Sequence, residues 1–144
     1  PSTITRLQNM GTPDYLISAA CQMVLAQRLA RRTCKECRVP DDDVNPKVLQ
    51  DLGFTPELAS RVKALKGKGC PKCKDTGYKG RQGLYEILVV SKPVKEAILR
   101  KATTPELREI AIKEGFQTMQ DMGRRLIANG ELNFREYERV LSAS

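Results

Sequence analysis

Two pairs of cysteines are the residues whose type and spacing point most directly to chemistry. Each pair has the form Cys-x-x-Cys, with Cys34 and Cys37 in the first pair and Cys70 and Cys73 in the second. Such a pair places two sulfur atoms on one tight turn, and two turns together offer the four thiolates of a tetrahedral zinc site. The sequence therefore predicts that these four cysteines bind one Zn²⁺ and that the metal closes the segment between the pairs into a loop.

A zinc site with four thiolate ligands is expected to be structural. It has no open coordination position for water or a substrate, and the sequence has no histidine that could act as a base beside it. The lack of histidine also excludes a Ser-His triad. We therefore expect this chain to contain neither catalytic residues nor residues that bind an organic cofactor.

A redox role is the alternative interpretation of a Cys-x-x-Cys motif. Neither pair has the strand-then-helix setting of a thioredoxin motif, and an odd number of cysteines without an export signal favours a reducing compartment. The fifth cysteine, Cys21, lies in an apolar stretch. We expect it to pack in the core as a small apolar residue.

The composition places the positive charge near the cysteines. The 144 residues carry a net charge of +8, with +4 in residues 28–38 and +7 in residues 61–81, and the hydrophobic share of 40% is enough for a buried core. A basic surface can meet an acidic protein face, lipid head groups or nucleic acid.

No apolar run is long enough to span a membrane, and residues 1–6 do not resemble a signal peptide. Pro1 in place of an initiator Met suggests a segment of a longer chain.

Helix-start and helix-stop signals predict an α+β fold that is mainly α. Helices are expected at residues 2–10, 46–53, 55–65, 91–101, 104–115, 118–130 and 133–141. A longer helix is predicted to begin at Thr12-Pro13-Asp14 and to run to about Arg32, which places Arg28, Arg31 and Arg32 on one basic face. Glycine-rich turns are expected at residues 66–69 and 76–83.

One strand is predicted, at residues 84–90. The segment is apolar on both faces except for Glu86. This pattern is typical of a strand inside a larger sheet, since both faces of such a strand are covered.

Five short motifs occur along the chain in a specific order. They are Gln27-Arg28-Leu29-x-Arg31, Cys34-x-x-Cys37, Gly69-Cys70-x-x-Cys73, Thr76-Gly77-Tyr78-x-Gly80-Arg81-x-Gly83-x-Tyr85-Glu86 and Glu114-Gly115-Phe116-x-Thr118-Met119. With these motifs the chain resembles the C-terminal part of the type IV pilus assembly and type II secretion traffic ATPases. The pilus-extension branch of that family is the more similar one.

The resemblance implies a division of the chain. Residues 1–33 would be the C-terminal tail of a RecA-like ATPase core, residues 34–80 a zinc-binding tetracysteine subdomain, residues 81–90 a core strand and residues 91–144 a helical C-terminal subdomain. Among the signature residues, Arg81 and Glu86 are expected to form an ion pair that braces the strand.

The resemblance also implies a function. Members of the family are hexameric motors that use ATP hydrolysis to drive pilus assembly or secretion through an inner-membrane platform protein. This chain has no G-x-x-x-x-G-K-[ST] loop for phosphates. ATP and Mg²⁺ are therefore expected only in the full-length protein, and this region is expected to supply structural and interaction surfaces.

The family further implies a cytoplasmic protein that is peripheral to the inner membrane, without membrane insertion and without a nucleic-acid partner. The alternative is a free-standing zinc-ribbon module that binds nucleic acid, which shares the four cysteines and the basic segments. That alternative leaves the ordered motifs unexplained, and Tyr78 is the one aromatic residue placed among the cations for stacking on bases.

Overall fold

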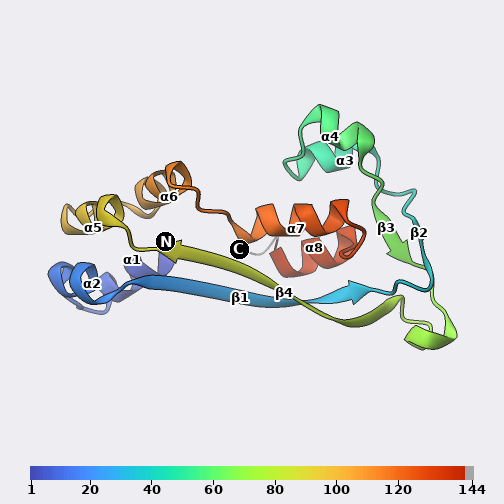
Figure 1. Ribbon diagram of the computed structural model, residues 1–144, viewed down its shortest axis with the longest axis horizontal. Helices are drawn as coiled ribbons and strands as arrows, with labels where there is room; N and C mark the ends of the chain where they lie inside the picture. Colours follow the sequence, from blue (N-terminus) through green and yellow to red (C-terminus); the bar gives the residue numbers. More distant parts are fainter. Residues whose placement is uncertain (142–144) are drawn as a thin grey trace. The chain divides into compact units, whose positions relative to one another are not determined.

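The computed structural model describes residues 1–141 and shows a mixed α+β fold (Figure 1). The helices are α1 (Ser2–Asn9), α2 (Asp14–Ala20), α3 (Pro46–Asp51), α4 (Pro56–Arg61), α5 (Lys92–Leu99), α6 (Thr104–Lys113), α7 (Met119–Ala128) and α8 (Phe134–Leu141), with a 3-10 helix η1 (Pro71–Cys73). The strands are β1 (Met23–Thr33), β2 (Arg38–Pro40), β3 (Leu65–Gly67) and β4 (Tyr78–Val89). The predicted α+β class is thus confirmed.

The chain divides into two compact units. Unit 1 consists of residues 1–26 and 85–118, and unit 2 consists of residues 27–84 and 119–144. Strands β1 and β4 contribute to both units, because each of them crosses the boundary.

Strands β1 and β4 pair with each other in a two-stranded sheet. In unit 1 the N–H of Val90 donates to the carbonyl of Gln22 (2.9 Å), and in unit 2 the N–H of Cys34 donates to the carbonyl of Gly77 (3.0 Å). The end of each strand therefore lies beside the start of the other, so the pair is antiparallel, as the opposed arrows in Figure 1 show. This pairing places Cys34 next to the segment that follows Cys73.

Unit 1 is built around a continuous apolar core. Its members come from α1, α2, the end of β4 and the residue after it, α5, α6 and the loop between these two helices. They are Ile4, Ile17, Leu88, Val90, Val94, Ala97, Ile98, Ala102, Leu107 and Ala111. Only one face of the β4 segment contributes to this core: Leu88 is 2% exposed, whereas its neighbours Ile87 and Val89 are 45% and 62% exposed. This alternation follows from the two-residue repeat of a strand.

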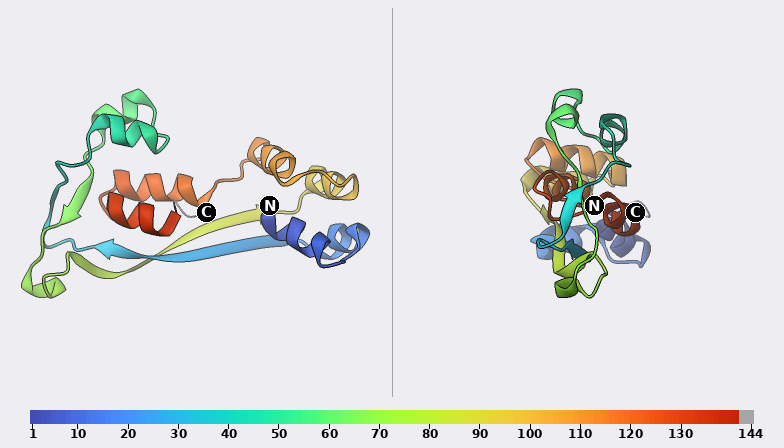
Figure 2. Two further views of the ribbon diagram at one scale, coloured as in Figure 1. Left: turned by 180° about the vertical axis from the view of Figure 1, so that it is seen from behind. Right: turned by 90° about the vertical axis from the view of Figure 1, so that its right-hand side faces the viewer.

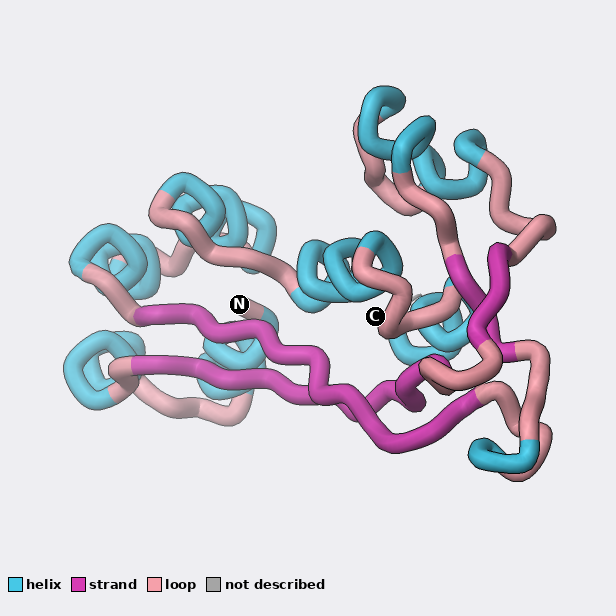
Figure 3. Tube along the Cα trace, turned by 45° about the vertical axis from the view of Figure 1, so that its right-hand side comes forward, coloured by secondary structure: helices cyan, strands magenta, loops and turns pink. Residues whose placement is uncertain are grey.

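Unit 2 contains a second, shorter pair of strands. Strands β2 and β3 are antiparallel, with Arg38 opposite Gly67 and Pro40 opposite Leu65. Figure 3 shows this pair joining helices α3 and α4 to the loop that carries η1. We call residues 34–77, which leave β1 and return to β4, the cysteine lobe. Unit 2 also contains the α7–α8 pair, whose helices lie side by side in Figures 1 and 2.

The predicted long helix from Thr12 to about Arg32 is wrong. Helix α2 ends at Ala20, and the following residues form β1 instead. Pairing with β4 determines this outcome, because a tertiary partner outweighs the helix preference of Leu, Gln, Arg and Ala. The arginines therefore do not share one helical face: on a strand, Arg31 and Arg32 point to opposite sides.

Most of the other helix starts are confirmed. The side-chain oxygens of Asn45, Thr55, Thr103 and Asn133 each accept a hydrogen bond from a backbone N–H three residues later, as helix caps do.

Among the boundaries that differ from the predictions, two lie where a strand forms. Helix α4 ends at Arg61 rather than near Leu65, because Leu65 begins β3. Strand β4 begins at Tyr78, inside the segment expected to be a turn. In both places the pairing with another strand decides the structure, and the sequence does not show which segments pair.

Candidate metal centre

Backbone pairing brings the two cysteine pairs together. The first pair lies between β1 and β2, and the second lies around η1, between β3 and β4. The antiparallel register of β2 and β3 continues beyond Arg38, because the N–H of Lys68 donates to the carbonyl of Cys37 (3.1 Å). At the other end, Cys34 is hydrogen-bonded to Gly77 (3.0 Å). Each turn of the cysteine lobe is thus held in place next to the other.

Two glycines permit this close approach. A Cβ atom at Gly67 would collide with the backbone of Gly77, and one at Gly77 would collide with the backbone of Gly67. Gly77 also has φ +81, a conformation that residues with side chains rarely adopt. Glycine is therefore required at both positions to bring β3 against the start of β4.

The four sulfur atoms of Cys34, Cys37, Cys70 and Cys73 lie within 4.8 Å of one another. The Sγ–Sγ distances are 3.8 Å for Cys34 and Cys70, 3.8 Å for Cys37 and Cys73, and 3.6 Å for Cys70 and Cys73. A tetrahedron with Zn–S bonds of about 2.3 Å has edges of about 3.8 Å, whereas a disulfide joins its sulfurs at about 2.05 Å. All four cysteines are free thiols in the structure, and their arrangement could hold a metal ion such as zinc.

Burial and backbone hydrogen bonds act on these thiols in opposite directions. Burial raises the pKa of Cys37 to about 12. Burial also opposes ionisation of Cys73, but the N–H groups of Gly77 and Cys70, each 3.3 Å from its Sγ, lower its pKa to about 6. The backbone around Cys73 therefore favours its thiolate form, whereas burial disfavours that of Cys37.

Cys21 is not part of this cluster. It lies in unit 1, after α2, is partly buried and packs against the apolar core of that unit. The expectation that it behaves as a small apolar residue is confirmed.

Sequence reasoning missed the role of Glu136. Its side chain is completely buried, and its carboxylate accepts hydrogen bonds from the backbone N–H of Arg31 (2.5 Å), the guanidinium of Arg31 (3.1 Å) and the guanidinium of Arg139 (2.7 Å). Burial alone would raise its pKa, but the hydrogen bonds from Arg139 and Arg31 lower the pKa to about 2. The sequence indicated only that Asn133 and Glu136 could cap a helix, because a partner 105 residues away leaves no local signal.

Two further arginines of the motifs, Arg28 and Arg81, and the neighbouring Arg32 have distinct surroundings. Arg28 donates to the carbonyl of Val140 (2.5 Å), and Arg32 donates to the side chain of Gln82 (2.7 Å). Arg81 is exposed. Its predicted ion pair with Glu86 remains a prediction.

A polar pocket of about 410 Å³ lies beside the cysteine lobe. Three basic side chains line it, those of Lys66, Lys68 and Arg135, and two acidic ones, those of Asp41 and Asp43. Lys66 and Asp41 form a loose ion pair (3.9 Å). The pocket therefore presents a net positive wall next to the candidate metal centre.

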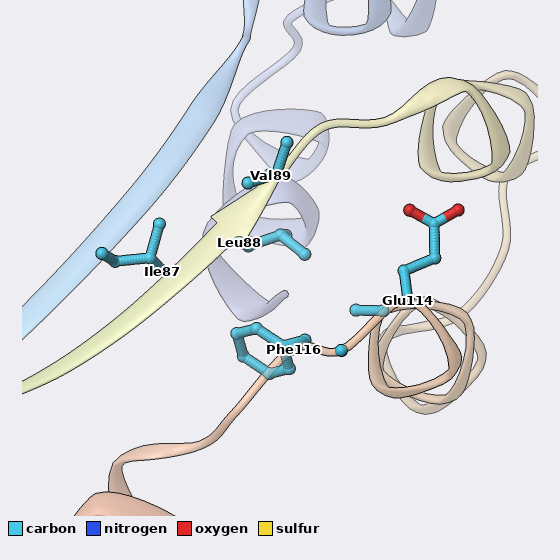
Figure 4. Close-up of a pocket in the computed structure, with 7 residues that line it drawn as sticks. Ile87, Leu88, Val89, Glu114 and Phe116 are labelled. Carbon is cyan, nitrogen blue, oxygen red and sulfur yellow. The ribbon is translucent and has the colours of Figure 1, made fainter.

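A smaller pocket in unit 1, of about 120 Å³, is lined by the end of β4 and the end of α6 (Figure 4). The ring of Phe116 lies near Leu88, and the carboxylate of Glu114 points away from that ring. A single carboxylate without a second acid or base nearby does not form a general acid–base pair. We assign no catalytic role to this pocket.

Within residues 1–141, no helix combines the length and the apolar character that crossing a bilayer requires.

Comparisons with known proteins agree with the motif pattern. A family model described as Type II/IV secretion system protein matches residues 1–139. The chain is 35% identical over 136 residues to the type IV pilus assembly ATPase PilB of Myxococcus xanthus and 40% identical over 120 residues to that of Thermus thermophilus. It is 34% identical over 138 residues to the type II secretion system protein E of Aeromonas hydrophila. These alignments cover 94%, 83% and 95% of the chain, but 24%, 13% and 26% of the respective relatives.

Proposed function

Because the chain belongs to the type II/IV secretion system protein family, we propose that it is the C-terminal region of a hexameric ATPase motor that powers type IV pilus assembly or type II secretion. The family match over residues 1–139 is the observation that carries this proposal. The chain spans roughly a quarter or less of the length of these relatives. ATP and Mg²⁺ would bind elsewhere in the full-length protein, which would be cytoplasmic and peripheral to the inner membrane.

Removal of the gene tests this proposal directly. A strain that lacks the full-length protein should fail to extend pili or to secrete, and the intact gene should restore the process. The full-length protein should hydrolyse ATP, whereas the 144-residue chain alone should release no phosphate above background. Normal piliation and secretion in the deletion strain would contradict the proposal.

We further propose that Cys34, Cys37, Cys70 and Cys73 hold one structural Zn²⁺. The all-thiolate donor set and the match between the Sγ–Sγ distances and a tetrahedral edge support this assignment. When bound, the ion would supply four bonds that join the two ends of the cysteine lobe, without an open position for catalysis.

Metal analysis of the purified chain tests the zinc site. Mass spectrometry of the metal content should find one zinc per chain, and Cys34→Ser or Cys73→Ser should remove it. Cys21→Ser is the matched control, because Cys21 lies outside the cluster, and it should leave the zinc content unchanged. Full zinc content in the Cys73→Ser chain would contradict the four-cysteine site.

The boundaries that we propose for the full-length protein follow the motifs. Residues 1–33 would end a RecA-like core, residues 34–80 would form the zinc subdomain, residues 81–90 would be a core strand and residues 91–144 would form the helical subdomain. The exposed apolar side chains on one face of the β1–β4 pair in unit 1, Met23, Leu25, Tyr85, Ile87 and Val89, support a core role. Such a face is normally covered, so we propose that the remainder of the core covers it.

We propose that the basic surface formed by Lys66, Lys68, Lys72 and Lys74 contacts a neighbouring subunit or the platform protein. Lys68 and Lys74 are exposed, and the side chains of Lys66 and Lys72 are 45% and 63% exposed. Lys66 and Lys72 are ion-paired with Asp41 (3.9 Å) and Glu36 (3.6 Å), so the surface carries both signs with an excess of positive charge. Such an excess guides association with an acidic partner and makes it depend on salt.

Reversal of these four charges to Glu tests the basic surface. Association of the full-length protein with itself or with the platform protein should weaken, and the residual binding should depend less on salt. The matched control reverses four exposed charges of unit 1, Lys92, Arg100, Arg108 and Lys113. If both sets of charge reversals weaken association equally, the basic surface contributes only to solubility. Tight, salt-dependent binding of DNA or RNA by the wild type would instead favour a nucleic-acid module.

A further inference from the structure

A closed ring of contacts links helix α8 to the end of β1 and the start of β4, the two strand ends that flank the cysteine lobe. The carboxylate of Glu136 binds Arg31 on β1, and the guanidinium of Arg31 lies over the ring of Tyr78 at the start of β4, 4.0 Å from its centroid. The hydroxyl of Tyr78 accepts a hydrogen bond from the side chain of Asn133 (2.8 Å). The side-chain oxygen of Asn133 in turn accepts from the backbone N–H of Glu136 (2.8 Å), which completes the ring.

Short backbone links connect this ring to the sulfur atoms. Thr33, which directly precedes Cys34, donates its N–H to the carbonyl of Glu131 in the turn between α7 and α8 (2.9 Å). Gly77, which directly precedes Tyr78, donates to the Sγ of Cys73 (3.3 Å) and accepts from the N–H of Cys34 (3.0 Å). A displacement of Arg31 or Tyr78 would therefore move the backbone that holds Cys34 and Cys73.

The ring depends on Glu136 more than on its other members. Its side chain is completely buried, whereas the side chains of Arg31 and Arg139 are 52% and 55% exposed. A buried carboxylate is stable only when its oxygens are paired, and here two guanidinium groups and one backbone N–H pair them. Loss of this charge would free both arginines and weaken the contact of α8 with β1.

We propose that Glu136 is a positioning residue for the cysteine cluster. Through Arg31 and the Asn133–Tyr78 pair, Glu136 holds the two cysteine-bearing segments in the geometry that binds a divalent metal ion. The inference rests on the proposed zinc site. Coupling between two sites acts in both directions, so the bound ion also holds helix α8 in place. The order of helix α8 should therefore depend on whether the cysteine lobe has bound a metal ion.

Zinc titration of three chains tests the positioning role. The wild type, Glu136→Gln and the control Glu138→Gln are each titrated with Zn²⁺ against a competing chelator, and Co²⁺ serves as a spectroscopic probe of the thiolate ligands. Glu138 is an exposed acid on the same helix, so the control makes the same charge change without entering the ring. Glu136→Gln should keep the Co²⁺–thiolate absorption but bind zinc about tenfold more weakly, the lower range for residues that orient metal ligands. The control should match the wild type.

Hydrogen exchange measures the reverse direction. Removal of zinc from the wild type should accelerate exchange of the α8 amides, and Glu136→Gln should exchange rapidly in α8 with or without zinc. Tyr78→Phe removes one hydroxyl of the ring and retains the aromatic face under Arg31. It should weaken zinc binding by about threefold, and it serves as the second variant if Glu136→Gln does not fold.

The two levels of the proposal fail in different ways. Equal zinc affinity of wild type, Glu136→Gln and Tyr78→Phe would overturn the positioning role and leave the zinc site intact. Failure of the wild type itself to bind zinc would overturn both the zinc site and the positioning role.

Discussion

The apolar core of unit 1 and the cysteine lobe of unit 2 rely on different interactions. Unit 1 buries a continuous apolar core in which Ile98 and Leu107 are completely inaccessible. In the cysteine lobe of unit 2, the cysteines form a buried cluster of their own, and only a few other side chains of the lobe, such as Leu49 and Ala59, are buried. Outside the lobe, unit 2 buries apolar side chains such as Leu84 and Ile127 and also a carboxylate, that of Glu136, which two arginines hold.

The difference shows how a short, loop-rich segment can be stabilised. The lobe helices α3 and α4 have six residues each and bury single side chains such as Leu49 and Ala59. So little apolar area does not offset the entropy lost when the segment is ordered, and small folds of this kind depend on metals or other cross-links. The two units should therefore respond differently to chelation, core mutation and acid.

Removal of the metal should produce the largest difference between the units. Because metal binding contributes on the order of 10 kcal/mol to such sites, a chelator should abolish hydrogen-exchange protection in residues 34–73. The amides of α5 and α6 in unit 1 should keep their protection. The same chelator saturated with zinc is the control. Unchanged hydrogen exchange in the lobe after chelation would contradict the claim that a bound metal stabilises the cysteine lobe.

A cavity in the apolar core should destabilise unit 1 and leave the cysteine lobe unaffected. Leu107→Ala should destabilise unit 1 by about 3 kcal/mol, because it removes buried methyl groups and leaves a void. Urea denaturation followed by exchange in α6 measures the loss, and zinc affinity should be unchanged. Leu99→Ala, at a side chain that is 53% exposed, is the control and should change stability by less than about 0.5 kcal/mol. A weaker zinc affinity in Leu107→Ala would show that the units are not independent.

Acid should act on unit 2 through Glu136. The pKa of Glu136 is lowered from 4.5 to about 2 in the folded chain. The carboxylate therefore stabilises the fold above its ordinary pKa, and this contribution is lost as the pH falls toward about 2. Glu136→Gln should lower the free energy of unfolding by about 2 kcal/mol at neutral pH. This difference from the wild type should shrink on acidification.

Unfolding experiments on the wild type and Glu136→Gln at several pH values measure this difference. Both chains are measured without zinc, so that the weaker zinc binding expected of Glu136→Gln does not contribute to the difference. A difference that stays constant down to about pH 2 would show that the carboxylate is not the group responsible.

Loss of single helix caps should have the smallest effect. Thr103→Ala in unit 1 and Thr55→Ala in unit 2 each remove a side-chain acceptor at a helix start, and each should cost about 1 kcal/mol. Exchange of the amides in α6 and α4 measures the two losses. Thr55→Ala should leave zinc affinity unchanged, and a large drop in that affinity would show that α4 supports the metal site directly.

The sequence was most informative where the signal is local. The spacing of Cys34, Cys37, Cys70 and Cys73 predicted a cluster that the structure places within 4.8 Å. Helix starts such as Asn45-Pro46 were also predictable, because a cap and a proline act within one turn.

The sequence was least informative where a distant partner decides. Residues 23–33 contain mostly good helix formers with few β-branched side chains, and their strand state comes from pairing with β4. Glu136 looked like an ordinary capping residue, because its partner Arg31 is 105 positions away. In both cases the determining contact joins segments whose proximity depends on the whole fold.

The cysteine lobe leaves and rejoins the β1–β4 pair at neighbouring points, because the N–H of Cys34 and the carbonyl of Gly77 are 3.0 Å apart. A segment whose ends meet can be lengthened, shortened or exchanged for a tight turn while the supporting strands stay as they are. The cost of closing such a segment also rises only slowly with its length. Evolution can therefore remodel the lobe as a module, grafting new contact surfaces onto an unchanged strand pair.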